Sequence, residues 1–228
     1  MSKLKPKIVL SRLDGANWTR KGLRPFLEYR DLGLAEATEG RIGGTIGRAI
    51  KKFETGYRAG VKTTNPKATV LVQYTGSFDN VAAGKQAAQD LVAKGCEVIF
   101  QAAGSDGNGA IQAIKEARAA GKQLYAIGTD SDQSHLAPEA VLTSMIKRVD
   151  LAVWQATSDL KDGKFTPSDV TMGLKEGGVG YATVRVELAD KAALLGKVEA
   201  LRAKVVAGEL KVPSNAADLA AFASPPGL

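Results

Sequence analysis

The feature that most constrains the fold is an alternation of short apolar runs with helical patterns across the middle of the chain. Each run is followed by Gly, Asp or Lys within a residue or two. Continuous apolar runs of this length that stop at polar or turn residues are typical of strands buried in a parallel sheet. The predicted strands are 70–74, 98–103, 124–128 and 140–145.

Helical patterns lie between the runs, with apolar residues at helical spacing. A glycine stands just after each of the three central patterns, at Gly95, Gly121 and Gly163, where a left-handed helix terminus favours it. This alternation predicts a doubly wound α/β fold with right-handed crossovers. The predicted helices are 49–62, 81–94, 109–120, 150–160 and 188–206.

The end of the chain departs from this alternation. The segments 172–173 and 179–184 flank a Gly-Gly pair and predict a small β-hairpin or edge pair. After Gly208, residues 209–213 predict a short strand, and we expect the Ala/Pro/Ser-rich tail that follows to be loose.

Composition excludes several classes of function. One Cys and one His in 228 residues exclude a disulfide framework and a Cys/His zinc cluster. The net charge is +7, but the Lys and Arg residues are scattered among 24 acids, so we expect no nucleic-acid binding. We expect His135 on the surface and Cys96 buried and inert, which leaves no catalytic residue and no metal site.

Ligands of open α/β sheets lie at the carboxyl ends of the strands, and three side chains there are candidates. Phe78 is either a stacking platform for a flat ring or an aromatic that caps the core. Asp130 either accepts hydrogen bonds from a sugar diol or caps a helix, although Asp132 is better placed as the cap. Lys147 either donates to a ring nitrogen or carbonyl oxygen or is simply solvated.

The loop that follows the second predicted strand is rich in glycine. Gly104, Gly107 and Gly109 invite a phosphate-loop interpretation, but their spacing fits neither the dinucleotide motif nor a Walker motif. The loop more simply lets backbone approach a neutral ligand.

The motifs as a set resemble the basic membrane protein family of ABC-transporter substrate-binding proteins, many of which are purine-nucleoside-binding lipoproteins. The resemblance runs from about Lys51 to Val212 and implies a type I periplasmic-binding fold. It also implies that the second α/β lobe is largely complete and the first mostly missing. The motifs that carry it are 53–60, 76–78, 84–85, 98–104, 127–133 and 141–147.

The resemblance implies ligand-binding roles for four residues. Phe78 would stack on the base, Gly104 would line the pocket, and Asp130 would bind the ribose hydroxyls. Lys147 would also contact the ligand. The implied protein is a monomeric binding component that is not an enzyme, has no cofactor and works with a transporter permease. The family implies a location in the periplasm or at the cell surface, although we expect no signal peptide or lipobox in this sequence.

The first 50 residues depart from the family, so we predict an atypical segment 1–50 and a binding-protein domain 51–228. The segment 18–49 resembles the opening of some small cupins, without their His-rich metal motif. Alternatives are a small α/β enzyme acting on a nucleoside or sugar, and a fusion product with no working site. An effector-binding regulator would need an N-terminal helix-turn-helix, which Pro25 and Gly43 disfavour.

Overall fold

The computed structural model describes residues 18–19, 29–30 and 42–223. The chain divides into two compact units, Met1–Tyr57 with Pro213–Ala221, and Arg58–Val212 with Phe222–Leu228. Most of the predicted segment 1–50 lies outside the described residues, as does the end of the tail. Every candidate site residue belongs to the second unit.

In the first unit, β1 (Trp18–Thr19) pairs antiparallel with β2 (Tyr29–Arg30). Helix α2 (Ile42–Thr64) contains the predicted helix 49–62 and extends beyond it at both ends. Its Thr55 is buried and donates a hydrogen bond to the carbonyl oxygen of Pro213 at 3.0 Å. This bond ties α2 to the chain just before α7 (Ala216–Ala221), so part of the tail that we expected to be loose is helical.

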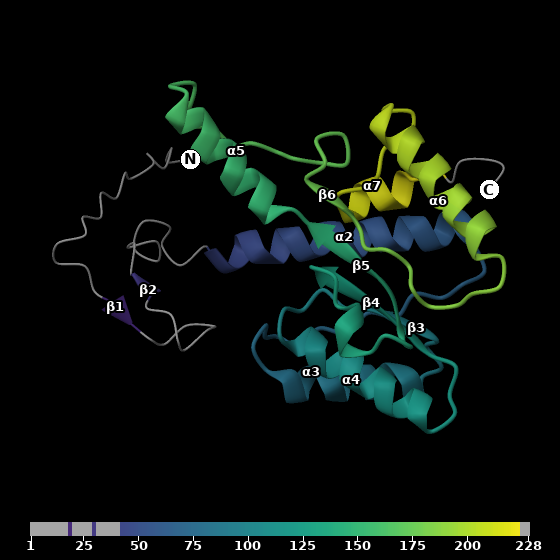
Figure 1. Ribbon diagram of the computed structural model, residues 1–228. Helices are drawn as coiled ribbons and strands as arrows, with labels where there is room; N and C mark the ends of the chain where they lie inside the picture. The colour runs from purple at the N-terminus through teal and green to yellow at the C-terminus, as the bar shows by residue number, and fades with distance from the viewer. Residues whose placement is uncertain (1–17, 20–28, 31–41, 224–228) are drawn as a thin grey trace. The chain divides into compact units, whose positions relative to one another are not determined.

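The second unit is built on one mixed, mostly parallel sheet (Figure 1). Its strands lie in the order β3 (Val98–Phe100), β4 (Tyr125–Asp130), β5 (Val141–Lys147) and β6 (Val179–Tyr181). The first three are parallel and β6 is antiparallel to β5. The three strands predicted at 98–103, 124–128 and 140–145 are therefore confirmed, with somewhat different ends.

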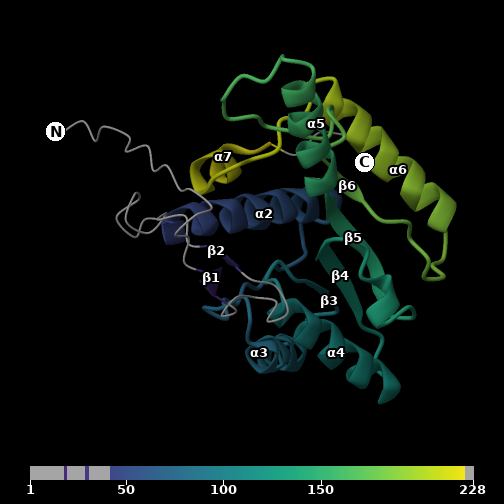
Figure 2. The ribbon, with the colours of Figure 1, turned by 60° about the vertical axis from the view of Figure 1, so that its left-hand side comes forward.

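Helices α3 (Val81–Ala93) and α4 (Asp106–Ala119) lie side by side on one side of this sheet (Figures 1 and 2). They approach closely because glycines face the contact: a Cβ on Gly84 would overlap the backbone of Asp106, and one on Gly109 would overlap the carbonyl of Val81. The main core forms between these helices and the strands. Its central members are Ala88, Ile99, Ala110, Ile111, Ala113, Ile114, Leu124, Ala126, Ala140 and Val141.

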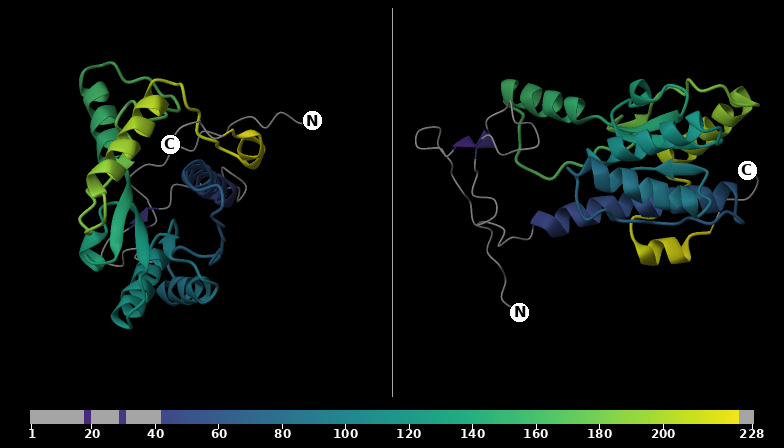
Figure 3. Two further views of the ribbon diagram at one scale, coloured as in Figure 1. Left: turned by 90° about the vertical axis from the view of Figure 1, so that its right-hand side faces the viewer. Right: turned by 90° about the horizontal axis from the view of Figure 1, so that it is seen from below.

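Helices α5 (Val149–Lys161) and α6 (Lys191–Val206) lie away from α3 and α4 (Figure 3). Both are described in full, and neither contains a buried residue. They confirm the helices predicted at 150–160 and 188–206. Within the described residues, no helix is long and apolar enough to cross a bilayer.

The strand predicted at 70–74 is wrong, because this segment is not part of the sheet. Leu71, Val72 and Tyr74 each expose 40% or more of their surface. An apolar run becomes a buried strand only where neighbouring layers cover both of its faces. The segment 70–74 is not covered in this way, so its apolar composition alone gave a wrong prediction.

The small β-hairpin or edge pair predicted from 172–173 and 179–184 is right for an edge strand in the second segment and wrong for its partner, because 172–173 is not part of the sheet. The strand Val179–Tyr181 pairs with β5 instead, with Met145 opposite Tyr181. The backbone N–H of Arg148 extends this pairing by donating to the carbonyl of Gly178 at 2.8 Å. Pairing with β5 joins three residues of β6, whereas the segment 172–173 could pair with only two. The strand predicted at 209–213 is also wrong, because these residues form no strand.

Candidate ligand-binding site

The carboxyl ends of β3, β4 and β5 meet at one edge of the sheet. Phe100 of β3 lies opposite Ile127 of β4, and Asp130 of β4 lies opposite Ile146 of β5. Parallel strands in this register deliver the loops that follow them to the same edge. This edge therefore collects Gly104, Asp130 and Lys147, which end or follow these three strands. Phe78 follows no strand and comes to the edge through its contact with Gly104.

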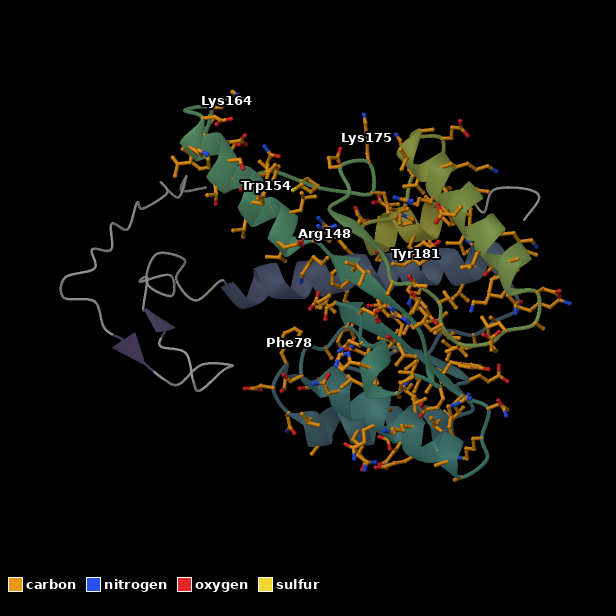
Figure 4. The ribbon with its side chains drawn as sticks, in the orientation of Figure 1. Phe78, Arg148, Trp154, Lys164, Lys175 and Tyr181 are labelled. Atoms are coloured by element: carbon orange, nitrogen blue, oxygen red, sulfur yellow. The ribbon has the colours of Figure 1, made fainter. Side chains whose placement is uncertain are left out.

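Phe78 and Gly104 form the first pair at this edge. Gly104 adopts a φ of 58°, and a Cβ built on it would lie 2.8 Å from the carbonyl oxygen of Phe78 and 3.2 Å from its Cβ. The next residue, Ser105, donates its N–H to the carbonyl oxygen of Phe78 at 2.8 Å. Phe78 as a residue is 38% exposed (Figure 4), so it does not serve as a fully buried cap of the core.

Asp106, which sequence reasoning missed, anchors the loop that carries Phe78. It is fully buried at the start of α4, and its Oδ1 accepts the N–H of Asn80 at 2.6 Å and the hydroxyl of Ser77 at 3.4 Å. Asn80 in turn caps α3 by accepting the N–H of Ala83. The sequence did contain a signal for this role. Asp106 begins a helix shortly after a strand, and a side chain in that position can reach a neighbouring loop.

Asp130 and Lys147 form the second pair. The Lys147 ammonium lies 2.7 Å from Asp130 Oδ1, and the two side chains are about half exposed, at 46% and 50%. Asp130 therefore does not cap a helix, and Lys147 is not merely solvated. A half-exposed ion pair leaves further donors on the ammonium and further lone pairs on the carboxylate for hydrogen bonds to a ligand.

The N-cap of the next helix is Gln133, so the prediction of Asp132 as the cap is wrong, although Asp132 does bind the chain where that helix begins. Asp132 Oδ1 accepts the N–H of Ser134 at 3.0 Å, at the start of the short 3-10 helix η1 (Ser134–Leu136). Its Oδ2 lies 2.6 Å from the guanidinium of Arg185. Hydrogen bonds from the backbone and hydroxyl of Ser134, and then from Arg185, lower the pKa of the Asp132 carboxyl to about 2.

The structure thus brings the four predicted residues together as two pairs on one edge. Among the described residues we find no direct bond between the pairs, but a partly buried hydrogen-bonded bridge joins their loops. Gln101, directly after β3, donates its side-chain amide to Gln133 Oε1 at 2.6 Å, and Gln133 Oε1 also accepts the N–H of Thr129. Sequence reasoning missed both glutamines, which look like ordinary loop residues.

The described residues offer little for catalysis or metal binding. They contain no group of three His, Cys, Asp or Glu side chains able to hold a metal ion. His135 is exposed, as predicted, with Nδ1 at 3.2 Å from the carbonyl oxygen of Asp132. Cys96, which we predicted to be buried, is partly buried against the core.

In an α/β lobe, the carboxyl edge of the sheet is where ligands bind, and here that edge carries an exposed aromatic and a charged pair. Residues 32–216 match the family described as ABC transporter substrate-binding protein PnrA-like (Bmp), and the chain belongs to this family. The predicted family is confirmed, and the match includes residues 32–50 of the segment that we predicted to be atypical. The family is one of transporter substrate-binding proteins and not of enzymes, as we expected.

The chain is similar to basic membrane protein D of Borreliella burgdorferi, with 34% identity over 76% of this chain and 51% of that protein. It is 35% identical to a CD4+ T-cell-stimulating antigen of Listeria monocytogenes, over 77% and 52% of the two chains. A solved solute-binding protein of an ABC transporter system from Aeropyrum pernix matches with a TM-score of 0.61 and 29% identity, over 74% and 56%. The chain spans about half the length of these relatives.

Proposed function

We propose that this chain supplies one wall of the solute-binding site of an ABC-type uptake system, and that the solute is a purine nucleoside. The observation that carries the proposal is the Asp130–Lys147 ion pair, which stands half exposed at the same sheet edge as Phe78 and Gly104. An exposed charged pair beside an aromatic ring suits a ligand with a polar sugar at one end and a flat ring at the other.

The aromatic side of this wall is Phe78. Its exposed ring offers a stacking surface for a purine, and such contacts contribute about 0.5–1.5 kcal/mol beyond the area they bury. Gly104 lets its loop approach Phe78 closely, since any larger residue there would press on the Phe78 backbone. The two residues together favour a planar ligand of low charge.

The polar side is the ion pair. The Asp130 carboxylate has lone pairs left after its bond to Lys147 and can accept both hydroxyls of a ribose diol. The Lys147 ammonium keeps donors for a carbonyl oxygen or a ring nitrogen of the ligand. Charge-assisted hydrogen bonds of this kind are stronger than neutral ones, so the sugar contributes to recognition.

Membership of the family supports a proposal about partners. We propose that the chain acts as a monomer with a transporter permease, in the periplasm or at the cell surface, where solutes are captured. Two-lobed receptors close around their ligand, and each lobe supplies part of the contacts. We expect the residues of this chain to supply one lobe's share of those contacts.

Isothermal titration calorimetry with inosine, guanosine and adenosine tests the proposal, with the corresponding free bases as comparison. Asp130→Asn should weaken nucleoside binding several-fold and leave free-base binding unchanged. Asp162→Asn is the matched control, because Asp162 also pairs with an exposed lysine but lies after α5. The absence of heat with any nucleoside at millimolar concentration would refute the proposal, and chromatographic release of free base would favour a hydrolase.

A further inference from the structure

The backbone at Asp130 adopts an uncommon conformation. Its φ is 73°. Among the non-glycine residues that the structure describes, only Asp190 also has a positive φ. Ser131, the next residue, donates its N–H to the carbonyl oxygen of Thr129 at 2.9 Å. A bond from residue i+2 back to residue i around a central φ near +75° describes the rare, strained form of γ-turn. Asp130 is therefore held at the end of β4 in a conformation that its own side chain disfavours.

A single residue, Gln133, joins this turn to several neighbouring elements through its side chain and its backbone N–H. Gln133 Oε1 accepts the N–H of Thr129 at 2.9 Å, the residue on which the turn closes. Its Nε2 donates to Asn108 of α4 at 3.2 Å, and its backbone N–H donates to Ser144 of β5 at 3.0 Å. With Gln101 as a further partner, Gln133 joins β4 to β5, to α4 and to the loop after β3.

The space for this amide is built into the strand. Gly128 lacks a side chain at the point where Gln133 lies, and a Cβ there would lie 2.7 Å from Gln133 Oε1 and would overlap the hydroxyl of Ser144. Ser144 itself is fully buried. Gly128, Gln133 and Ser144 thus form a fitted arrangement directly beneath the strained turn.

We propose that Gln133 is a positioning residue that holds Asp130 in the γ-turn and so directs its carboxylate toward Lys147 and the solute. The part of this role that concerns the solute rests on the proposed function. The part that concerns the backbone conformation of Asp130 does not. Strained backbone persists only where its surroundings fix it. Without the Gln133 amide, residue 130 relaxes toward ordinary strand geometry and its carboxylate leaves the position that the ion pair defines.

The first test needs no ligand. Amide hydrogen exchange of Ser131 reports whether the turn is closed, and Gln133→Ala should accelerate it at least tenfold while exchange at Ile99 in β3 stays unchanged. Combining Gln133→Ala with Asp130→Gly should restore protection of Ser131, because glycine accepts a positive φ without restraint. Gln155→Ala on α5 is the matched control and should change neither amide.

Unchanged Ser131 exchange in Gln133→Ala, or no recovery in the double variant, would overturn the proposal. If Gln133→Ala does not fold, Gln133→Glu keeps an acceptor for the N–H of Thr129 and loses the donor to Asn108. Protection of Ser131 in Gln133→Glu should then stay within threefold of the parent chain, and a tenfold loss would contradict the role of the acceptor.

The second test uses inosine. Gln133→Ala should weaken binding about tenfold in the parent chain and should have no further effect in the Asp130→Gly background, because the two residues act through one carboxylate. Additive losses would mean that Gln133 acts on the ligand by another route and would overturn the positioning role. If the parent chain binds no nucleoside, the proposed function fails, while the exchange experiment still decides the turn.

Discussion

The two sides of the second unit are built very differently. The α3–α4 side places Ile111 and Ile114 in full burial and brings helices into backbone contact at Gly84 and Gly109. On α5, by contrast, Trp154 is 63% exposed, although this helix shows the same kind of apolar spacing (Figure 4). The comparison teaches that helical periodicity predicts a helix, whereas burial depends on what faces it.

The well-packed α3–α4 side also holds the loops of the candidate site in place. The loop of Phe78 is held by Asp106 of α4 and by the cap of α3, and Gln133 reaches Asn108 of α4. The ligand-facing edge is therefore anchored on the well-packed side. We expect substitutions on that side to affect both stability and binding, and substitutions on α5 to affect neither strongly.

The largest expected effect is the loss of core packing. Ile114→Ala removes a fully buried side chain between α4 and the sheet and should lower the free energy of unfolding by about 2–5 kcal/mol. Trp154→Ala on α5 should cost less than about 1 kcal/mol, because its ring is mostly in solvent. Urea unfolding of both variants measures the contrast, and equal losses would show that α5 is packed as tightly as α4.

A pair of glycine substitutions sharpens the comparison. Gly84→Ala forces a Cβ into the backbone of Asp106 and should destabilise the chain by about 1–3 kcal/mol. Gly196→Ala on α6 meets no atom within 4 Å and should stabilise it by about 0.5–1 kcal/mol. Thermal unfolding should thus shift in opposite directions, and a shared sign would contradict the close approach of α3 and α4.

At the carboxyl edge of the sheet, we expect one substitution to raise stability and to weaken ligand binding. Asp130→Gly removes the positive-φ strain and loses only an exposed ion pair, so it should stabilise the chain by about 0.5–1 kcal/mol. The same change should weaken nucleoside binding, because the carboxylate is gone. Denaturant unfolding together with calorimetry checks both halves, and a loss of stability would indicate that Asp130 is not strained.

The smallest expected effect is a dependence on acid pH. Because folding lowers the pKa of Asp132 from its ordinary 3.8 to about 2, its contribution is present above about pH 4 and is lost as the pH falls toward 2. Solvent screens this partly exposed group, so we expect at most about 1 kcal/mol. The Tm difference between the parent chain and Asp132→Asn should shrink over that range.

The same titration separates the partners of Asp132. Its pKa is lowered first by the hydrogen bonds from Ser134 and only then by Arg185. Arg185→Gln should therefore reduce the acid dependence without abolishing it. A complete loss in Arg185→Gln would instead identify the ion pair as the dominant cause.

Much of the site could be predicted from the sequence. Apolar runs that end in polar residues located the ends of β3, β4 and β5, and these placed Gly104, Asp130 and Lys147 on one edge. Phe78 was assigned to that edge from a strand at 70–74 that does not form, and it lies there because its loop contacts Gly104 and Ser105. Their pairing was not predictable, because it depends on the register between β4 and β5 and on the approach of one loop to another. Asp106 and Gln133 were missed for the same reason, since their partners lie up to 32 residues away along the chain.

The sequence by itself determined the order of the central helices and strands, the family, and the residues that end each strand. Local periodicity and turn preferences encode these features, and each depends on residues close together in the chain. Only the tertiary structure decided that 70–74 is no strand, that β6 pairs with β5, and that Asp130 occupies a strained turn beside Gln133. Those outcomes depend on contacts between residues that lie far apart in the sequence. Local sequence patterns do not encode the energies of such contacts.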